Sequence, residues 1–205
     1  MKRLMSLCAF CLITTAFSGE SGSPLSLLQQ RYQQATLVSS QFTQEKQTQF
    51  ISQPLRSTGQ FSYAKNHGLI WEITTPFTSR TLFAKGNNMF IEDNHGRWVK
   101  SDNDPLNLAV AELLTELLSG HWDKLQEQFR MQPATQDQGD WSVTLDAQGR
   151  WVKKALQRLI LRGNKELQHI VIIDKQGNQT VLTLKNVQLQ NKTLTKSQVS
   201  AFAHP

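Results

Sequence analysis

Histidine is the residue type in this sequence that could most readily bind a metal or act as a general base. No two of the five histidines have the H-E-x-x-H spacing of a helical zinc site, and three lie in or beside expected turns, where a solvated imidazole is ordinary. The five are His67, His95, His121, His169 and His204. We therefore predict no metal site and no cofactor.

Motifs for nucleophilic catalysis and phosphate binding are missing from the sequence. It contains no G-x-S-x-G elbow, no Walker loop and no dinucleotide glycine pattern. A Ser-His-Asp set could still assemble in space, but most of the acidic residues fall in expected turns or on polar helix faces. The sequence therefore predicts a protein that is not an enzyme and has no catalytic residues.

Surplus apolar surface is the feature that does point to a function. Between Thr58 and Pro76, large apolar residues alternate with polar ones on both sides of Asn66-His67-Gly68, which is the pattern of a β-hairpin. One face of this ribbon carries Phe61, Tyr63, Leu69, Trp71 and Ile73. Other expected strands are apolar on both faces, as in Met89-Phe90-Ile91 and residues 170–173. This surface must be buried by helices, by curvature or by a guest molecule.

The elements expected to position this surface are helices and closely spaced strands. A helix is predicted over residues 24–36, with Pro24 near its first turn. Gly and Asn at the reversals separate the strands, which are expected at 41–50, 55–65, 69–75, 79–85, 88–93, 97–100, 141–145, 156–162, 167–174 and 180–189. Even spacing of this kind predicts an α+β fold: an unclosed antiparallel β-barrel, or curved sheet, with helices covering the concave side as a lid.

A helical segment between the two groups of strands has one broad apolar face. Asp104-Pro105 is a cap and first-turn pair, and Gly120 stops the helix. A second short amphipathic piece covers residues 122–129. The apolar face of the helix that begins at Asp104-Pro105 makes this helix either a core plug or a separable lid over an apolar cavity. The candidate lid residues are Leu113, Leu114, Leu117 and Leu118.

Residues 1–18 have the pattern of a secretory signal, with a charged start, an apolar middle and the small-x-small triplet Ala16-Phe17-Ser18. The apolar run is shorter than the about 20 residues that span a bilayer. Both cysteines, Cys8 and Cys11, lie inside it, so the exported chain is expected to have no disulfide. We predict cleavage near Ser18, a single domain over residues 19–205 and a bacterial periplasmic location.

The charge of the chain is mildly basic and does not indicate nucleic-acid binding. The formal net charge is +6, and it falls by two when Lys2 and Arg3 leave with the signal. The remaining Lys and Arg residues are scattered and do not alternate with aromatic residues, so no nucleic-acid partner is expected. Attraction to an anionic membrane surface remains open.

Three motifs, in their order and spacing, resemble those of the periplasmic outer-membrane lipoprotein carrier family, the LolA-like proteins. They are Val38–Gln44 after the first helix, Gly59–Lys65 followed by Trp71 and Pro76, and Gly86–Phe90. The resemblance covers most of the chain and implies an unclosed barrel whose helices hold a cavity for acyl chains. It also implies a protein that is not an enzyme, with an inner-membrane donor complex and an outer-membrane acceptor.

The sequence departs from this family pattern at two places. Lys65-Asn66-His67-Gly68 stands where the family usually has a basic residue followed by proline, and the end, Thr195–Pro205, lacks the longer tail of the lipoprotein carriers. Both a lipoprotein and another lipid therefore stay open as cargo. A carrier that hands its cargo on is most simply a monomer.

The predicted function is a periplasmic carrier that binds acyl chains of a lipid or lipoprotein and shuttles it from the inner toward the outer membrane. The alternative is a periplasmic chaperone or assembly module that holds a protein partner through the same apolar face; a small hydrolase of lipid-linked substrates is a third. Period-2 parity assigns the lipid-binding positions. They are Phe42, Phe61, Tyr63, Leu69, Trp71, Ile73, Phe83, Met89 and Ile91.

Overall fold

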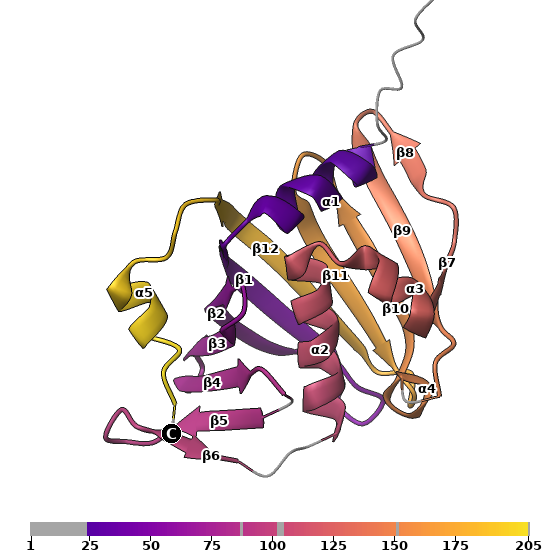
Figure 1. Ribbon diagram of the computed structural model, residues 1–205. Helices are drawn as coiled ribbons and strands as arrows, with labels where there is room; N and C mark the ends of the chain where they lie inside the picture. Colours follow the sequence, from indigo (N-terminus) through magenta and orange to yellow (C-terminus); the bar gives the residue numbers. More distant parts are fainter. Residues whose placement is uncertain (1–23, 87, 102–104, 151, 205) are drawn as a thin grey trace, which may run out of the picture.

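The computed structural model describes residues 24–86, 88–101, 105–150 and 152–204. The predicted signal segment and its cleavage position lie outside these residues. Within them, no helix is both long enough and apolar enough to cross a membrane. Figure 1 shows a large curved sheet with helices lying against its inner side.

Five helices and twelve strands make up the described part of the chain. The helices are α1 Pro24–Gln34, α2 Pro105–Ser119, α3 Trp122–Gln128, α4 Val152–Ala155 and α5 Lys196–Ser200. The strands are β1 Leu37–Gln47, β2 Leu55–Ala64, β3 Gly68–Thr75, β4 Ser79–Ala84, β5 Asn88–Glu92, β6 Trp98–Lys100, β7 Phe129–Met131, β8 Thr135–Asp137, β9 Asp140–Ala147, β10 Leu156–Gly163, β11 Leu167–Asp174 and β12 Gln179–Gln190.

All the strands belong to one antiparallel sheet whose order is β6-β5-β4-β3-β2-β1-β12-β11-β10-β9-β7, with β8 paired to β9. The first strand, β1, pairs with the last strand, β12, in the middle of the sheet. The sheet curves around α2 and α3 without closing (Figure 1). This is the unclosed antiparallel architecture predicted from the strand spacing, and α1, α2 and α3 cover its concave side as predicted.

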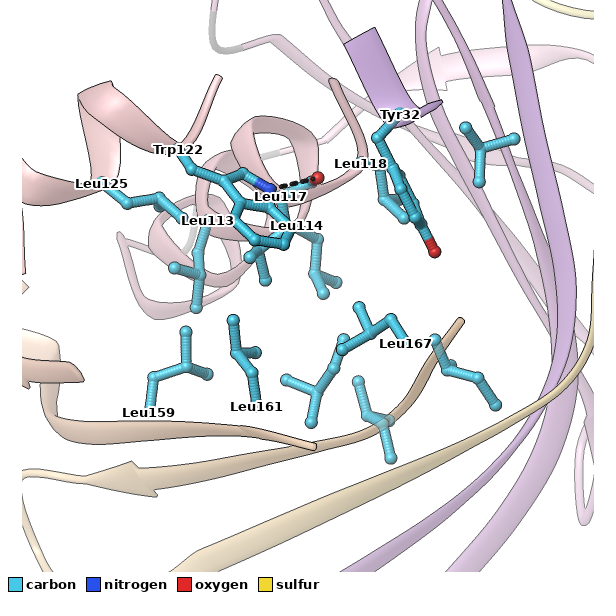
Figure 2. Close-up of a cluster of buried hydrophobic side chains, with 14 of the residues drawn as sticks. Tyr32, Leu113, Leu114, Leu117, Leu118, Trp122, Leu125, Leu159, Leu161 and Leu167 are labelled. Atoms are coloured by element: carbon cyan, nitrogen blue, oxygen red, sulfur yellow. Dashed lines mark hydrogen bonds between the residues drawn. The ribbon is translucent and has the colours of Figure 1, made fainter. Parts of the chain in front are cut away.

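The main hydrophobic core lies between the concave face of the sheet and the helices. Figure 2 shows leucines of α2 and Trp122 of α3 facing Leu159 and Leu161 of β10 and Leu167 of β11, with Tyr32 of α1 beside them. Full burial of each such leucine stabilises the fold by about 1.5–3 kcal/mol. This core fixes α2 over the sheet.

A second hydrophobic cluster lies on the convex face. Strands β3, β4 and β5 contribute Ile70, Leu82 and Phe90 to it, and Phe202 from the chain's own C-terminal tail covers them. Helix α5 begins with a capping box in which the Thr195 side chain accepts from the Gln198 backbone N–H and the Gln198 side chain accepts from the Thr195 backbone N–H. The tail therefore explains why these strands are apolar on both faces.

The structure corrects several predicted boundaries. The strand predicted over 41–50 covers 37–47, because the alternation already begins with buried Val38 and Ser40, and the chain turns after Gln47. Strands β7 and β8 are too short, at three residues each, to leave a period in the sequence. Helices α4 and α5 were not predicted; the Thr195 capping box was the available signal for α5.

Candidate functional site: an apolar cavity under helix α2

The register of the sheet places the nine predicted strand positions on one face. Residues paired directly across antiparallel strands share a face. Phe42 pairs with Gly59, and Phe61 with Trp71. The remaining pairs continue the same face outward: Tyr63 with Leu69, Gly59 with Ile73, Leu69 with Phe83, Phe83 with Met89, and Thr81 with Ile91. This is the concave face, which α2 covers.

An aromatic stack crosses the first three strands of this face. The Trp71 ring stacks on Phe42, with centroids 4.0 Å apart and an interplanar angle of 24°. It also lies parallel to the Phe61 ring at 5.8 Å. Gly59 makes room for this arrangement, because a Cβ there would lie 2.8 Å from the Phe42 ring and 1.9 Å from the backbone oxygen of Glu72. Packing therefore requires the glycine that begins the Gly59–Lys65 motif.

Beside this stack lies a cavity of about 300 Å³ between the sheet and α2. Strands from both halves of the sheet, together with one face of α2, supply its apolar wall. That wall consists of Trp71, Phe83, Met89, Ile91, Val110, Ala111, Leu114, Leu156, Ile172 and Leu182. Its polar residues are Gln44, Lys46, Thr81, Asn107, Asp174 and Thr180. The volume lies at the lower end of the range of small-molecule sites, about 300–1,000 Å³.

The predicted lipid-binding residues divide between cavity and core. Trp71, Phe83, Met89 and Ile91 line the cavity. The other five pack in the main core or against it: Phe42, Phe61, Tyr63, Leu69 and Ile73. Alternation along the strands predicts that these nine residues share a face, but it does not predict where α2 lies over that face. A role for any of them in lipid binding stays a prediction.

The predicted lid residues divide in the same way. Leu114 lines the cavity, whereas Leu113, Leu117 and Leu118 are buried in the main core. Helix α2 is therefore a cavity wall over its N-terminal half and a core element over its C-terminal half. The core plug and the lid, which are the two interpretations that the sequence left open, each describe part of α2.

The C-terminal end of α2 is held against α1. Gly120 has φ of +72°, and a Cβ there would lie 2.6 Å from the Gln33 backbone nitrogen. The Gln33 side-chain amide donates a hydrogen bond of 3.0 Å to the Gly120 carbonyl, and the Trp122 indole N–H donates to the Leu117 carbonyl at 3.1 Å. The end of α2 farther from the cavity is therefore the fixed end.

Tyr63 lies under this fixed end. Burial raises the pKa of its hydroxyl, the Glu116 carboxylate raises that pKa further, and a hydrogen bond with Ser119 lowers it. Glu116 and Ser119 both belong to α2. Tyr63 thus connects β2 to the helix, which explains why it packs in the core away from the cavity wall.

Sequence reasoning missed the polar part of the cavity. Gln44 and Lys46 continue the even-numbered alternation of β1 that buries Val38 and Phe42, so period-2 parity alone places them on the concave face. Thr180 lies opposite Lys46 on β12, and Asp174 ends β11. A search confined to large apolar side chains passes over these positions.

No metal centre is built from the described residues, in which no group of three or more His, Cys, Asp or Glu side chains could hold an ion. Two of the histidines instead contact aromatic rings: His67 lies near Phe202 and His204 near Phe90. His169 has its Nδ1 3.3 Å from the Thr183 hydroxyl. These histidines are accounted for by local packing and hydrogen bonding.

An unclosed antiparallel barrel with helices on its concave side and an apolar cavity beneath them defines a structural class. The sequence places the chain within that class. A family model described as outer membrane lipoprotein carrier protein LolA-like matches residues 22–200, and the chain belongs to this family. No curated protein matches the sequence.

The chain is similar to several solved structures at low sequence identity. A LolA superfamily protein from Nitrosomonas europaea is 13% identical, with a TM-score of 0.47, over 85% of this chain and 94% of that one. A DUF1329 family protein from Desulfovibrio piger is 9% identical, with a TM-score of 0.48, over 87% and 96%. MucB from the Pseudomonas aeruginosa MucA/MucB complex is 9% identical, with a TM-score of 0.44; 86% of this chain aligns with 59% of that one.

Proposed function

We propose that this protein is a periplasmic carrier that binds acyl chains of a lipid or lipoprotein in the cavity under α2 and shuttles it from the inner toward the outer membrane. The observation that carries the proposal is the cavity itself, about 300 Å³ of space with a largely apolar wall between a curved sheet and a helix. Membership of the LolA-like family supports the same function. The function requires binding and release and no chemical step.

The free energy of hydration explains why such a carrier is needed. Exposure of an acyl chain to water costs about 0.8 kcal/mol per CH₂, so a sixteen-carbon chain carries a cost on the order of 12 kcal/mol. Free diffusion through an aqueous compartment is therefore negligible. A carrier must offset most of this cost and still release the lipid, and an apolar cavity under a helix that is held at one end combines moderate affinity with release.

In the cell, we propose that residues 1–18 are removed near Ser18 and that residues 19–205 act as one monomeric carrier domain. Cargo would pass from an inner-membrane donor complex to the carrier and then to an outer-membrane acceptor. The N-terminal half of α2 covers the cavity, while Gly120 and Gln33 hold the other end. Entry and release would therefore occur at the N-terminal end of the helix.

Native mass spectrometry of the protein purified without detergent tests the proposal. A bound mass of lipid size, together with binding of a fluorescent fatty acid by the emptied protein, supports a carrier. A bound peptide favours the chaperone or assembly function, and turnover of a lipid ester favours a hydrolase. A protein that purifies empty and takes up no fatty acid contradicts the carrier.

A further inference from the structure

Lys46 places a positive charge in the wall of a largely apolar cavity. It follows Phe42 and Gln44 on the concave face of β1, lies opposite Thr180, and is partly buried. Its neighbour Glu45 points to the other face, where it pairs with Arg56 at 3.1 Å. The inward direction of Lys46 is thus fixed by the strand.

The Lys46 ammonium has no hydrogen-bond or ion-pair partner among residues 24–86, 88–101, 105–150 and 152–204. Within the described part of the chain, Asp174 is the one acidic residue that lines this cavity, and both of its oxygens already accept hydrogen bonds. One accepts from the backbone N–H groups of Gln176 and Asn178 at 2.9 and 2.8 Å, and the other accepts from the Asn178 side-chain amide at 2.8 Å. Among these described residues the cavity therefore offers an ammonium group without a partner, and a carboxylate whose oxygens are hydrogen-bonded within its own turn.

Three of the six polar cavity residues meet at one end of the cavity, beside the turn between β11 and β12. Lys46 lies one residue before the end of β1, Thr180 one residue after the start of β12, and Asp174 at the end of β11. Lys46 is four residues beyond Phe42, a distance of about 13 Å along a strand. The wall therefore runs from the Phe42–Trp71 stack to a polar end.

This polar end is fixed in place by contacts between two turns. The Gln49 side-chain amide donates to the Gln176 carbonyl at 2.7 Å, and its backbone N–H donates to the Asn178 side chain at 3.3 Å. The turn after β1 is thereby attached to the turn between β11 and β12. The backbone of Lys46 therefore lies at a strand end that these contacts hold in place.

We propose that the preferred guest is a single-chain amphiphile with an anionic oxygen head group, either carboxylate or phosphate, and that the Lys46 ammonium binds this group. The chain lies against Trp71, Phe83 and Met89 under α2, and the lysine's own methylene groups extend the apolar wall. A volume of about 300 Å³ suits one chain better than several. This assignment rests on the proposed carrier function and names its ligand class.

The test compares probes of equal chain length and different head group, below their micellar concentrations at pH 8. Dodecanoate and monododecyl phosphate are anionic, dodecan-1-ol is neutral and dodecyltrimethylammonium is cationic. By isothermal titration calorimetry we expect both anionic probes to bind about tenfold more tightly than the alcohol, and the cation most weakly. Added salt should weaken only the anionic probes' binding. Acetate alone should not compete, because it lacks a chain.

Variants locate the effect at one side chain. Lys46→Met should weaken dodecanoate binding about tenfold and leave dodecan-1-ol binding unchanged, while Lys46→Arg should retain the preference. Lys192→Met removes an exposed lysine that does not line the cavity and should change neither affinity. The salt comparison on the unaltered protein gives an answer even if Lys46→Met fails to fold.

The outcomes separate this inference from the proposed function. Equal, salt-independent affinity for dodecanoate and dodecan-1-ol, or tighter binding of the cation, overturns the head-group assignment and leaves the carrier standing. Failure to bind any twelve-carbon probe overturns the carrier and this inference together. Competition by acetate alone shows a plain anion site and also contradicts the amphiphile.

Discussion

The Trp71 ring of β3 lies 4.0 Å from the Phe42 ring of β1, although strand β2 runs between them. The contact is possible because the intervening residue on β2 is Gly59. Phe42 is buried in the main core, whereas Trp71 is partly exposed at the cavity wall. This pair is where the core becomes the binding surface.

Replacement of Trp71 by Glu should abolish binding of a fluorescent fatty acid while the far-UV dichroism spectrum of the folded protein persists. A carboxylate at the cavity wall removes apolar contact and opposes an acyl chain. Trp71→Phe should retain most of the affinity. Unfolding of Trp71→Glu would instead assign the residue to core packing alone.

Filling the cavity from the helix side should weaken binding in proportion to the added volume. Ala111 is buried on α2 and lines the cavity. The series Ala111→Val, Ala111→Leu and Ala111→Phe should lower fatty-acid affinity stepwise, by tenfold or more for Phe, with a change in the free energy of unfolding of roughly 1–3 kcal/mol at most. Affinity that is constant along the series would place the ligand elsewhere.

Gly120→Ala should destabilise the protein by about 2 kcal/mol or more. The positive φ costs about 1–2 kcal/mol for any side chain, and the new Cβ would also meet the α1 backbone at 2.6 Å. Gly139→Ala is the matched control, with φ of +94° and nothing within 4 Å of the added Cβ. Urea unfolding of both variants isolates the contact with α1. Equal losses would mean that α1 yields without cost.

The pH dependence of stability should show a contribution from Asp146. Hydrogen bonds from Arg158 at 2.7 Å and from Gln132 at 2.7 Å hold the pKa of this carboxyl below its ordinary value of 3.8. A lowered folded-state pKa stabilises the fold above the unfolded-state value, and this stabilisation is lost as the pH falls through the folded-state value.

Asp146→Asn should therefore lower the free energy of unfolding at pH 7 by on the order of 1 kcal/mol or less, since solvent screens this surface carboxylate. The difference from the unaltered protein should shrink as the pH falls below 3.8. Thermal unfolding measured between pH 7 and pH 2.5 checks the trend. A difference that grows toward acid would give the opposite sign and contradict the assignment.

Phe202→Ala should destabilise the fold by about 3 kcal/mol without changing ligand affinity. The ring is 4% exposed and packs on the convex cluster, on the opposite face from the cavity. Val199→Ala is the control, because Val199 on α5 is 37% exposed and should cost little. Lost affinity in a folded Phe202→Ala protein would indicate that the two faces are coupled.

The apolar faces of helical segments predicted the covering helices, and alternation along the strands predicted the sheet, because period 2 is a local property of the chain. It could not predict which face residues meet the cavity, since that depends on where α2 rests. Leu114 and Leu117 have the same residue type on one helix, yet only Leu114 lines the cavity. The same alternation places Lys46 on the concave face, but only large apolar side chains were predicted as site residues. The contact of Phe202 with the convex cluster joins residues that are far apart in the sequence, so no periodic pattern predicts it.

Strands β6 and β7 form the two margins of the sheet, and within the described residues no ladder joins them. Movement of one margin away from the other consequently breaks no hydrogen bond between strands. The chain itself bridges the two margins, because β6 is followed by α2 and α3 and these lead into β7, and the side chains of both helices pack on the sheet. We therefore expect a ligand larger than the cavity to bind only as far as the margins can move apart beneath the helices that connect them.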